Sequence, residues 1–254
     1  MDWEFFGLKA CHFSGLKSSP IARSLICAFV GFSLVSGCAS VEDDLANDPF
    51  EEVNRTIFDF NNEIDNSVFE PVAQTYVDNV PNTLRLAVRN ALKFLKTPMI
   101  FANNVLQGNL DGAGNTVSRF LVNGITGFGG TVDVAADSGV PYVKEDFGQT
   151  LAVWGVPDGP YLVLPGLGPS TMRDTLAMIP DAFLTPLWLI DHDRTSYSLT
   201  AIDLIDTRAR YLGLESVVIG DEYLFYRDAY LQSRQFEIKD GEIEDDFDDF
   251  DDFN

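Results

Sequence analysis

Residues 48–61 read DPFEEVNRTIFDFN and begin a segment with clear helical periodicity. Along and after this stretch the apolar residues Ile57, Phe60, Ile64 and Val68 recur at spacings of three and four. Such spacing places side chains on one face of an α-helix and is not the alternation typical of a strand. The chain is therefore predicted to begin its folded part with an amphipathic helix.

The ends of this helix are also predicted from the sequence. Asp48 is suited to cap the helix, Pro49 to occupy its first position, and Glu51 to complete a capping box. Pro71 is expected to end or bend the helix, because proline lacks the backbone N–H that a helix interior needs.

The same spacing recurs further along the chain, and glycine and proline mark the breaks. Gly108 is expected to stop one helix as a C-terminal glycine. Residues 125–170 hold most of the glycine and much of the proline, so compact loops are expected there, with YLVL (161–164) as a short extended piece. The fold class is therefore mainly α, with at most short strands. Helices are predicted over 83–95, from Thr97-Pro98 to 108, over 111–124, over 198–212 and around 221–234.

The N-terminal region resembles a bacterial lipoprotein signal. Residues 24–37, SLICAFVGFSLVSG, form an apolar run that is too short to span a membrane and follows basic residues. Val35-Ser36-Gly37-Cys38 resembles a lipobox, in which the cysteine receives lipid and becomes the new N-terminus. The alternative is an ordinary signal peptide with an incidental cysteine. Lipidation of Cys38 is favoured. Removal of residues 1–37 takes Cys11 and Cys27 away, and lipid on Cys38 then leaves no unpaired thiol in an oxidising compartment.

Charge and the residue after Cys38 bear on the partner and the location of the protein. The chain has 254 residues and a net charge of −22, so a nucleic-acid partner is not expected. Ala39 after the lipidated cysteine favours the outer membrane.

The predicted organisation is a signal peptide (1–37), a tether (38–48), a helical domain (49–235) and a disordered acidic tail (236–254). The tail carries ten acids and one lysine.

Catalysis finds little support in the residues. His192 lies between two aspartates in a predicted surface turn, and no GxSxG motif accompanies it. GLGPST (166–171) matches a phosphate-binding glycine loop only weakly. No zinc-ligand spacing is present. From these observations together, no catalytic residue, metal or other cofactor is predicted.

Residues 182–190, AFLTPLWLI, are a proline-interrupted apolar run. Trp188 suits the headgroup region of a membrane, but a buried core segment explains the run equally well. The candidates for membrane contact here are Phe183, Leu184, Leu187 and Trp188.

Long strings of the chain resemble the MlaA family, also called VacJ, of outer-membrane lipoproteins for phospholipid transport. The likeness runs from about residue 48 to about 235. It is carried by DPFEEVNRTIFDFN (48–61), VPNTLRLAVRNALKFLKTP (80–98), NNVLQG (103–108), SRFLVNGITGFGGTVDVA (118–135), EDFGQTLAVWGVPDGPYLVLPGLGPSTMRD (145–174) and DTRAR (206–210).

The resemblance implies a ring-like helical protein embedded in the periplasmic leaflet of the outer membrane, without enzymatic activity. It also implies association with trimeric porins and an amphipathic channel that passes phospholipids to a periplasmic lipid carrier. Phe128, Gly129 and Gly130 form a glycine-rich segment that exposes amides to a headgroup or simply makes a tight turn. Asn54, Phe58, Phe60 and Asn61 are candidates for the channel lining, with the solvated face of the first helix as the alternative. A structural lipoprotein that stabilises porins is the alternative function, and a lipid-modifying enzyme is a third.

Overall fold

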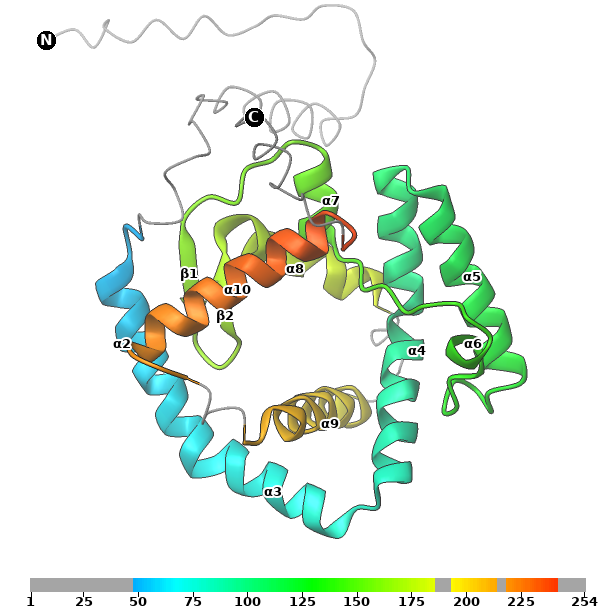
Figure 1. Cartoon of the computed structure of the whole chain (residues 1–254), viewed down its shortest axis with the longest axis horizontal. Coiled ribbons are helices and arrows are strands. Elements are labelled where there is room, and N and C mark those ends of the chain that lie inside the picture. Colours follow the sequence, from blue (N-terminus) through cyan, green and yellow to red (C-terminus); the bar gives the residue numbers. More distant parts are fainter. Residues whose placement is uncertain (1–47, 186–192, 214–217, 242–254) are drawn as a thin grey trace, which may run out of the picture. The chain divides into compact units, whose positions relative to one another are not determined.

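A computed structural model describes residues 48–185, 193–213 and 218–241. The described domain is mainly helical, as predicted, and its elements are shown in Figure 1. They are α2 (Glu51–Ile64), the π-helix η1 (Asp65–Phe69), α3 (Glu70–Asn79), α4 (Asn82–Gln107), α5 (Leu110–Ile125), α6 (Val134–Asp137), α7 (Phe147–Val153), β1 (Tyr161–Leu164), β2 (Gly168–Thr171), α8 (Met172–Leu184), α9 (Asp193–Tyr211) and α10 (Glu222–Ile238).

The elements follow a closed circuit. Helices α2, η1 and α3 run on from one another, α3 packs on α9, and α9 packs on α4. Helix α4 contacts α7 and α8, which lead through β2 to β1, and β1 packs back on α2. The ring-like arrangement implied by the resemblance is therefore confirmed for the described elements.

The first helix starts and continues differently from the prediction. Asp48 does not cap it: the helix begins at Glu51, and Phe50 occupies the cap position without a side-chain hydrogen bond. Instead, the Asp48 carboxylate accepts from the Phe50 N–H and from the Asn54 amide. Pro71 does not end the helical path: it lies in the first turn of α3, directly after the π-helix η1.

The two helices predicted around Thr97-Pro98 are one continuous helix, α4, with Pro98 in its interior. Packing of α4 against α5, α7, α8 and α9 outweighs the single hydrogen bond that proline removes. Gly108 ends this helix with φ of +78°, as predicted.

The glycine-rich middle contains more structure than predicted. YLVL forms β1, which pairs antiparallel with β2 as a hairpin, so the GLGPST match falls on the hairpin turn and β2. The short helices α6 and α7 also lie in this region, and a capping box between Asp146 and Gln149 starts α7. Helix α10 reaches Ile238, so residues 236–238 of the predicted tail are helical. Residues 1–37, Cys38, His192 and 242–254 lie outside the described residues.

Candidate functional site: an apolar outer surface around a polar interior

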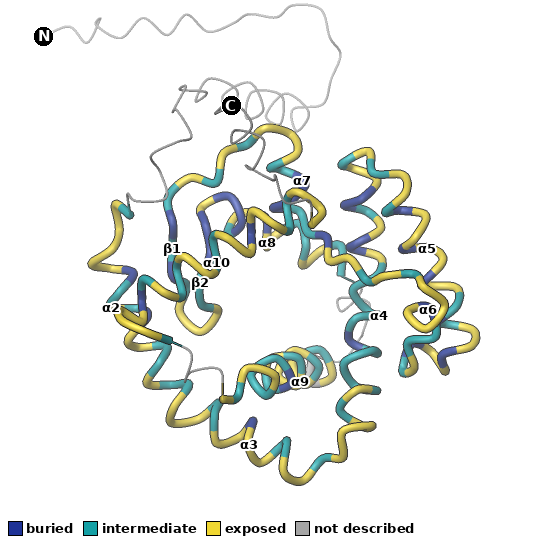
Figure 2. The backbone as a smooth tube through the Cα atoms, in the orientation of Figure 1, coloured by how far each residue is buried: buried dark blue, intermediate teal, exposed yellow. Residues whose placement is uncertain are grey.

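Hydrophobic and polar side chains are distributed in an unusual way in the described domain. There, 11 hydrophobic side chains are buried, whereas 33 large hydrophobic side chains are exposed. The largest fully buried side chains are Gln149, Glu145 and Asn54. Figure 2 shows the buried residues in small groups at contacts between elements, without one central core. An exposed apolar surface of this extent is typical of a membrane or protein contact.

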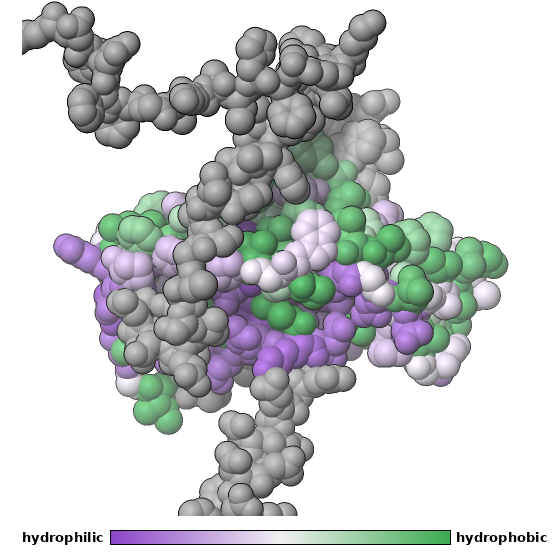
Figure 3. All heavy atoms as spheres, turned by 90° about the horizontal axis from the view of Figure 1, so that it is seen from above, coloured by the Kyte–Doolittle hydropathy of each residue, from purple (hydrophilic) through white to green (hydrophobic). Residues whose placement is uncertain are grey.

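The exposed apolar residues form stripes on two helices. On α5, Leu110, Val117, Leu121 and Ile125 recur at helical spacing and are exposed. On α8, Met172, Leu176, Ile179 and Phe183 do the same. Figure 3 shows one side of the domain, where hydrophobic residues gather in the upper part and hydrophilic residues in the lower part. No helix among the described residues has the length and apolarity to cross a membrane.

The predicted membrane-facing residues divide into two pairs. Phe183 is exposed on α8, and Leu184 beside it is half-buried. Leu187 and Trp188 lie outside the described residues. The exposure of Phe183 fits the prediction of membrane contact, which stays a prediction for all four.

Two of the predicted channel residues have a different role. The Asn54 side chain is 1% exposed, and its amide donates to the Tyr161 carbonyl at 3.0 Å and accepts from the Val163 N–H at 2.9 Å. Phe58 is buried against Tyr223, with ring centroids 5.7 Å apart. Asn54 therefore belongs neither to a lining nor to a solvated face, and Phe58 is a core residue.

Asn61 repeats this bridge two turns further along α2. Its amide donates to the Leu164 carbonyl at 3.0 Å and accepts from the Gly166 N–H at 2.7 Å, which holds the tip of the hairpin. Phe60, between Asn54 and Asn61 on α2, is exposed. Of the residues proposed on α2 as lining, Phe60 alone keeps a side chain available to a lipid.

The glycine-rich segment forms a tight turn. The N–H of Gly129 donates to the Gly124 carbonyl and that of Gly130 to the Asn123 carbonyl, at 3.3 and 2.9 Å. These two amides are thus used within the protein and are not offered to a headgroup. Phe128, between them and α5, has φ of +52° and is 83% exposed.

A network of buried charges joins α7, α8 and α10, and sequence reasoning missed it. The Arg234 guanidinium is buried and donates to Asp146 at 2.6 Å and to Asp174 at 2.8 Å. Burial opposes the ionisation of both carboxyls, but the Arg234 hydrogen bonds outweigh it and lower their pKa. The spacing of Asp146 and Gln149 is typical of a capping box, and it is the one feature of the sequence from which this site could have been predicted.

Glu145 lies next to this network and is completely buried. Its Oε2 accepts from Gln107 at 2.8 Å, while its Oε1 has no hydrogen-bond partner among the described residues. The pKa of Glu145 is raised to about 7. Burial is the largest cause and the neighbouring Asp240 and Asp146 add to it, while the Gln107 hydrogen bond opposes it. Nothing in the sequence distinguishes this acid from the many exposed ones.

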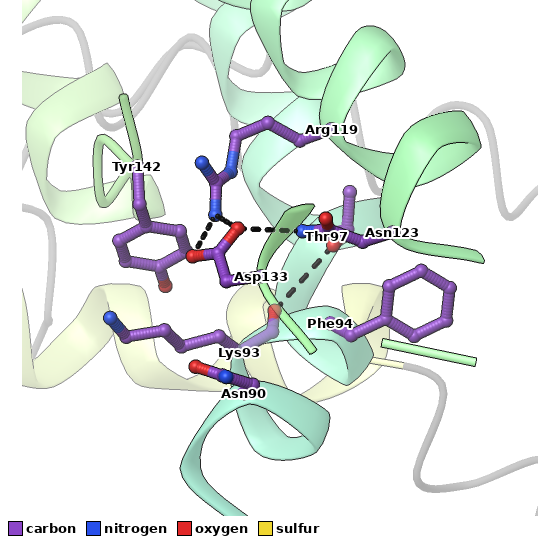
Figure 4. Close-up of a pocket in the computed structure, with 8 residues that line it drawn as sticks. All are labelled: Asn90, Lys93, Phe94, Thr97, Arg119, Asn123, Asp133 and Tyr142. Atoms are coloured by element: carbon purple, nitrogen blue, oxygen red, sulfur yellow. Dashed lines mark hydrogen bonds and ion pairs between the residues drawn. The ribbon is translucent and has the colours of Figure 1, made fainter. Parts of the chain in front are cut away.

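A second polar cluster lies between α4, α5 and the segment that follows α5 (Figure 4). Arg119 donates to both oxygens of Asp133 at 2.7 Å, and Asn123 donates to Asp133 at 2.9 Å. Burial raises the pKa of Asp133, but these hydrogen bonds outweigh it, so the pKa is lowered. No group of three or more potential metal ligands occurs in the described part of the chain.

Comparison with known proteins decides the family. A family model described as MlaA lipoprotein matches residues 46–237. The chain belongs to the MlaA lipoprotein family. The resemblance seen in the sequence is thereby confirmed.

Individual members of the MlaA family agree with this assignment. A protein of Escherichia coli named "Intermembrane phospholipid transport system lipoprotein MlaA" is 34% identical over 223 residues, which cover 84% of this chain and 88% of the relative. Its namesake in Haemophilus influenzae is 30% identical over 238 residues, covering 90% and 94%. An uncharacterized protein of Rickettsia felis is 33% identical over 208 residues, covering 80% and 81%.

A solved structure also matches. It is described as "Structural basis for maintenance of bacterial outer membrane lipid asymmetry" and has a TM-score of 0.69 at 32% identity. The match covers 76% of this chain and 99% of the solved one. This chain therefore shares the fold of nearly the whole solved chain.

Proposed function

We propose that this chain is the outer-membrane lipoprotein of an intermembrane phospholipid transport system. In this role it removes phospholipids from the outer leaflet and so maintains lipid asymmetry. The names of the relatives and the description of the solved structure support this proposal. The structural observation that carries it is the exposed apolar surface on a domain whose largest buried side chains are polar.

The physical reason for such a protein is the cost of moving a charged headgroup through hydrocarbon. A ring of helices with apolar outer stripes stays in the membrane while offering a polar path within it. The chain then lowers the barrier without making or breaking a bond, so we propose no catalytic role.

The finer parts of the proposal concern anchoring and partners. Lipid on Cys38 holds the chain at the periplasmic leaflet, because buried acyl chains contribute about 0.8 kcal/mol per CH₂. The chain associates with trimeric porins, and a periplasmic carrier receives the lipid. The family resemblance supports both partners.

The test is the amount of phospholipid in the outer leaflet of cells that lack this chain. We expect an excess that the wild-type chain corrects and that Cys38→Ala does not. Equal amounts in all strains, together with a loss of porin assembly, would favour a structural role at the envelope instead. Release of lysolipid or fatty acid by the purified chain would favour a lipid-modifying enzyme.

A further inference from the structure

The polar cluster of Figure 4 surrounds a small cavity of about 20 Å³. A cavity of this size holds about one water molecule, so it can receive a single phosphate oxygen but not a whole lipid headgroup. Eight residues from α4, α5 and the segment after α5 line it: Asn90, Lys93, Phe94, Thr97, Arg119, Asn123, Asp133 and Tyr142.

The charges in this cavity do not balance. Arg119 and Asp133 neutralise each other through their two-fold hydrogen bond. The Lys93 Nζ instead lies 4.7 Å from the centre of the Tyr142 ring, and no carboxylate among the described residues lies within ion-pair distance of it. By contrast, Lys96 on the same helix reaches Asp203 at 2.7 Å. Among the described residues, the Lys93 amine is therefore a basic group of this cavity without a carboxylate beside it, in a chain whose net charge is −22.

The surroundings of Lys93 make an anion favourable there. Burial lowers the pKa of Lys93, Asp133 raises it, and Arg119, Arg89 and Arg210 lower it further. Each of these guanidinium groups has a carboxylate partner, because Arg119 pairs with Asp133, and Arg89 and Arg210 pair with Asp206. Burial of the amine is the largest cause of the lowered pKa, and an anion beside it would replace the lost solvation. Burial also raises the pKa of Tyr142 to about 12, so its hydroxyl keeps a proton to donate at neutral pH.

An apolar surface begins at the same place. Phe94 lines the cavity and stacks on Phe120, with ring centroids 5.0 Å apart. Phe120 is 44% exposed on α5. A molecule that places an anion beside Lys93 thus finds apolar contacts next to it.

We propose that Lys93 binds the phosphate group of a phospholipid, with the phosphate oxygens at the cavity and the acyl chains along the exposed face of α5. This deepens the proposed function and rests on it for the source of the phosphate. A lysine ammonium is a compact charge with three donors and a common phosphate ligand in proteins. Free phosphate offers the same oxygens, and the apolar stack of Phe94 and Phe120 favours the lipid.

The test uses the full-length lipidated chain in dodecyl maltoside, a detergent without phosphate. Dihexanoylphosphatidylcholine and inorganic phosphate are titrated separately, and the affinity of each is measured from the broadening of its ³¹P resonance. Because a charge-assisted contact is lost, Lys93→Met should weaken lipid binding about tenfold. Lys93→Arg should restore most of it, and Lys96→Met is the matched control that should change it little.

The outcomes separate the possibilities. Binding of the lipid that depends on Lys93 supports the proposal, and binding of inorganic phosphate alone that depends on Lys93 makes free phosphate the source. Equal lipid binding by wild type, Lys93→Met and Lys96→Met overturns the proposal. If the wild-type chain then still restores lipid asymmetry in cells, the proposed function stands without this site. Lipid binding that depends on Lys93, in a chain that restores no asymmetry, would support the site and overturn the proposed function.

Discussion

Asn54 on the first helix holds Val163 on the hairpin, 109 residues further along, through a hydrogen bond of 2.9 Å from the Val163 N–H to the Asn54 side-chain oxygen. The same side chain donates to the Tyr161 carbonyl at 3.0 Å. One amide thus satisfies two buried backbone groups of a strand edge, which otherwise lack a partner on that side. Together with the packing of α2 on β1, this contact joins the two ends of the circuit of elements.

Asn54→Ala should destabilise the domain by about 2–4 kcal/mol, because it leaves a buried N–H and a buried C=O without partners. Asn61→Ala is the matched comparison, since Asn61 makes the equivalent pair of bonds at the half-buried tip of the hairpin and should cost less than half as much. Thermal unfolding of the purified variants in detergent measures both. Equal losses for the two variants would contradict the role assigned to Asn54.

Gly130→Ala should be far more harmful than Gly129→Ala. Both glycines have positive φ, +86° and +69°, so either substitution costs about 1 kcal/mol in backbone strain. A Cβ at Gly130 would also overlap the Phe94 ring, whereas a Cβ at Gly129 meets nothing within 4 Å. The difference between the variants should be about 1–3 kcal/mol in the free energy of unfolding, which is the usual cost of overpacking. No difference would mean that the segment after α5 does not hold Phe94 in place.

Arg234→Met should cost about 3–5 kcal/mol, because it leaves the buried carboxylates of Asp146 and Asp174 without their cation. The control is Lys144→Met. Lys144 pairs with Asp146 at 3.7 Å and with Glu237 at 3.3 Å, but its side chain is 53% exposed, so its loss should cost less than about 1 kcal/mol. Denaturant unfolding distinguishes the two. Similar losses would show that the network is not held by Arg234.

Stability should rise as the pH falls from about 7 to about 4.5, the interval between the raised and the ordinary pKa of Glu145. In this interval the folded chain binds a proton at Glu145 that the unfolded chain does not, so protonation favours folding by at most about 3 kcal/mol. Below pH 4 the trend reverses, because Asp146 and Asp174 have lowered pKa values and lose their stabilising charge.

Glu145→Gln is the control for this pH dependence. It places an uncharged amide in the same position and should be more stable than wild type at pH 8. It should also remove most of the rise between pH 7 and 4.5, leaving the part from Asp158 and Asp181, whose pKa values burial also raises. An unchanged pH profile in the variant would assign the dependence to other groups.

The sequence was sufficient for the fold class, the stop at Gly108 and the strand at 161–164, because these depend on local periodicity and backbone preference. It misled at Pro98 and Asp48, where packing and a distant tyrosine decide the outcome: the Tyr223 hydroxyl donates to Asp48, 175 residues away. Local signals carry no information on such contacts.

The candidate site was harder to predict for the same reason. Periodicity locates an apolar stripe on α5 but does not show whether the stripe faces a core or a membrane. The buried positions of Asn54 and Glu145 and the half-buried position of Lys93 depend on which elements meet. Their residue types resemble those of a solvated helix face, so only the assembled fold distinguishes them.

The most direct measurement of the central claim is the return of phospholipid from the outer leaflet of living cells. A short-chain fluorescent phospholipid is inserted into that leaflet, and the fraction still extractable by external albumin is followed with time. Cells that carry this chain should lose extractable lipid faster than cells that lack it, and re-expression should restore the faster rate. Identical rates in all three strains would contradict a transport role for this chain.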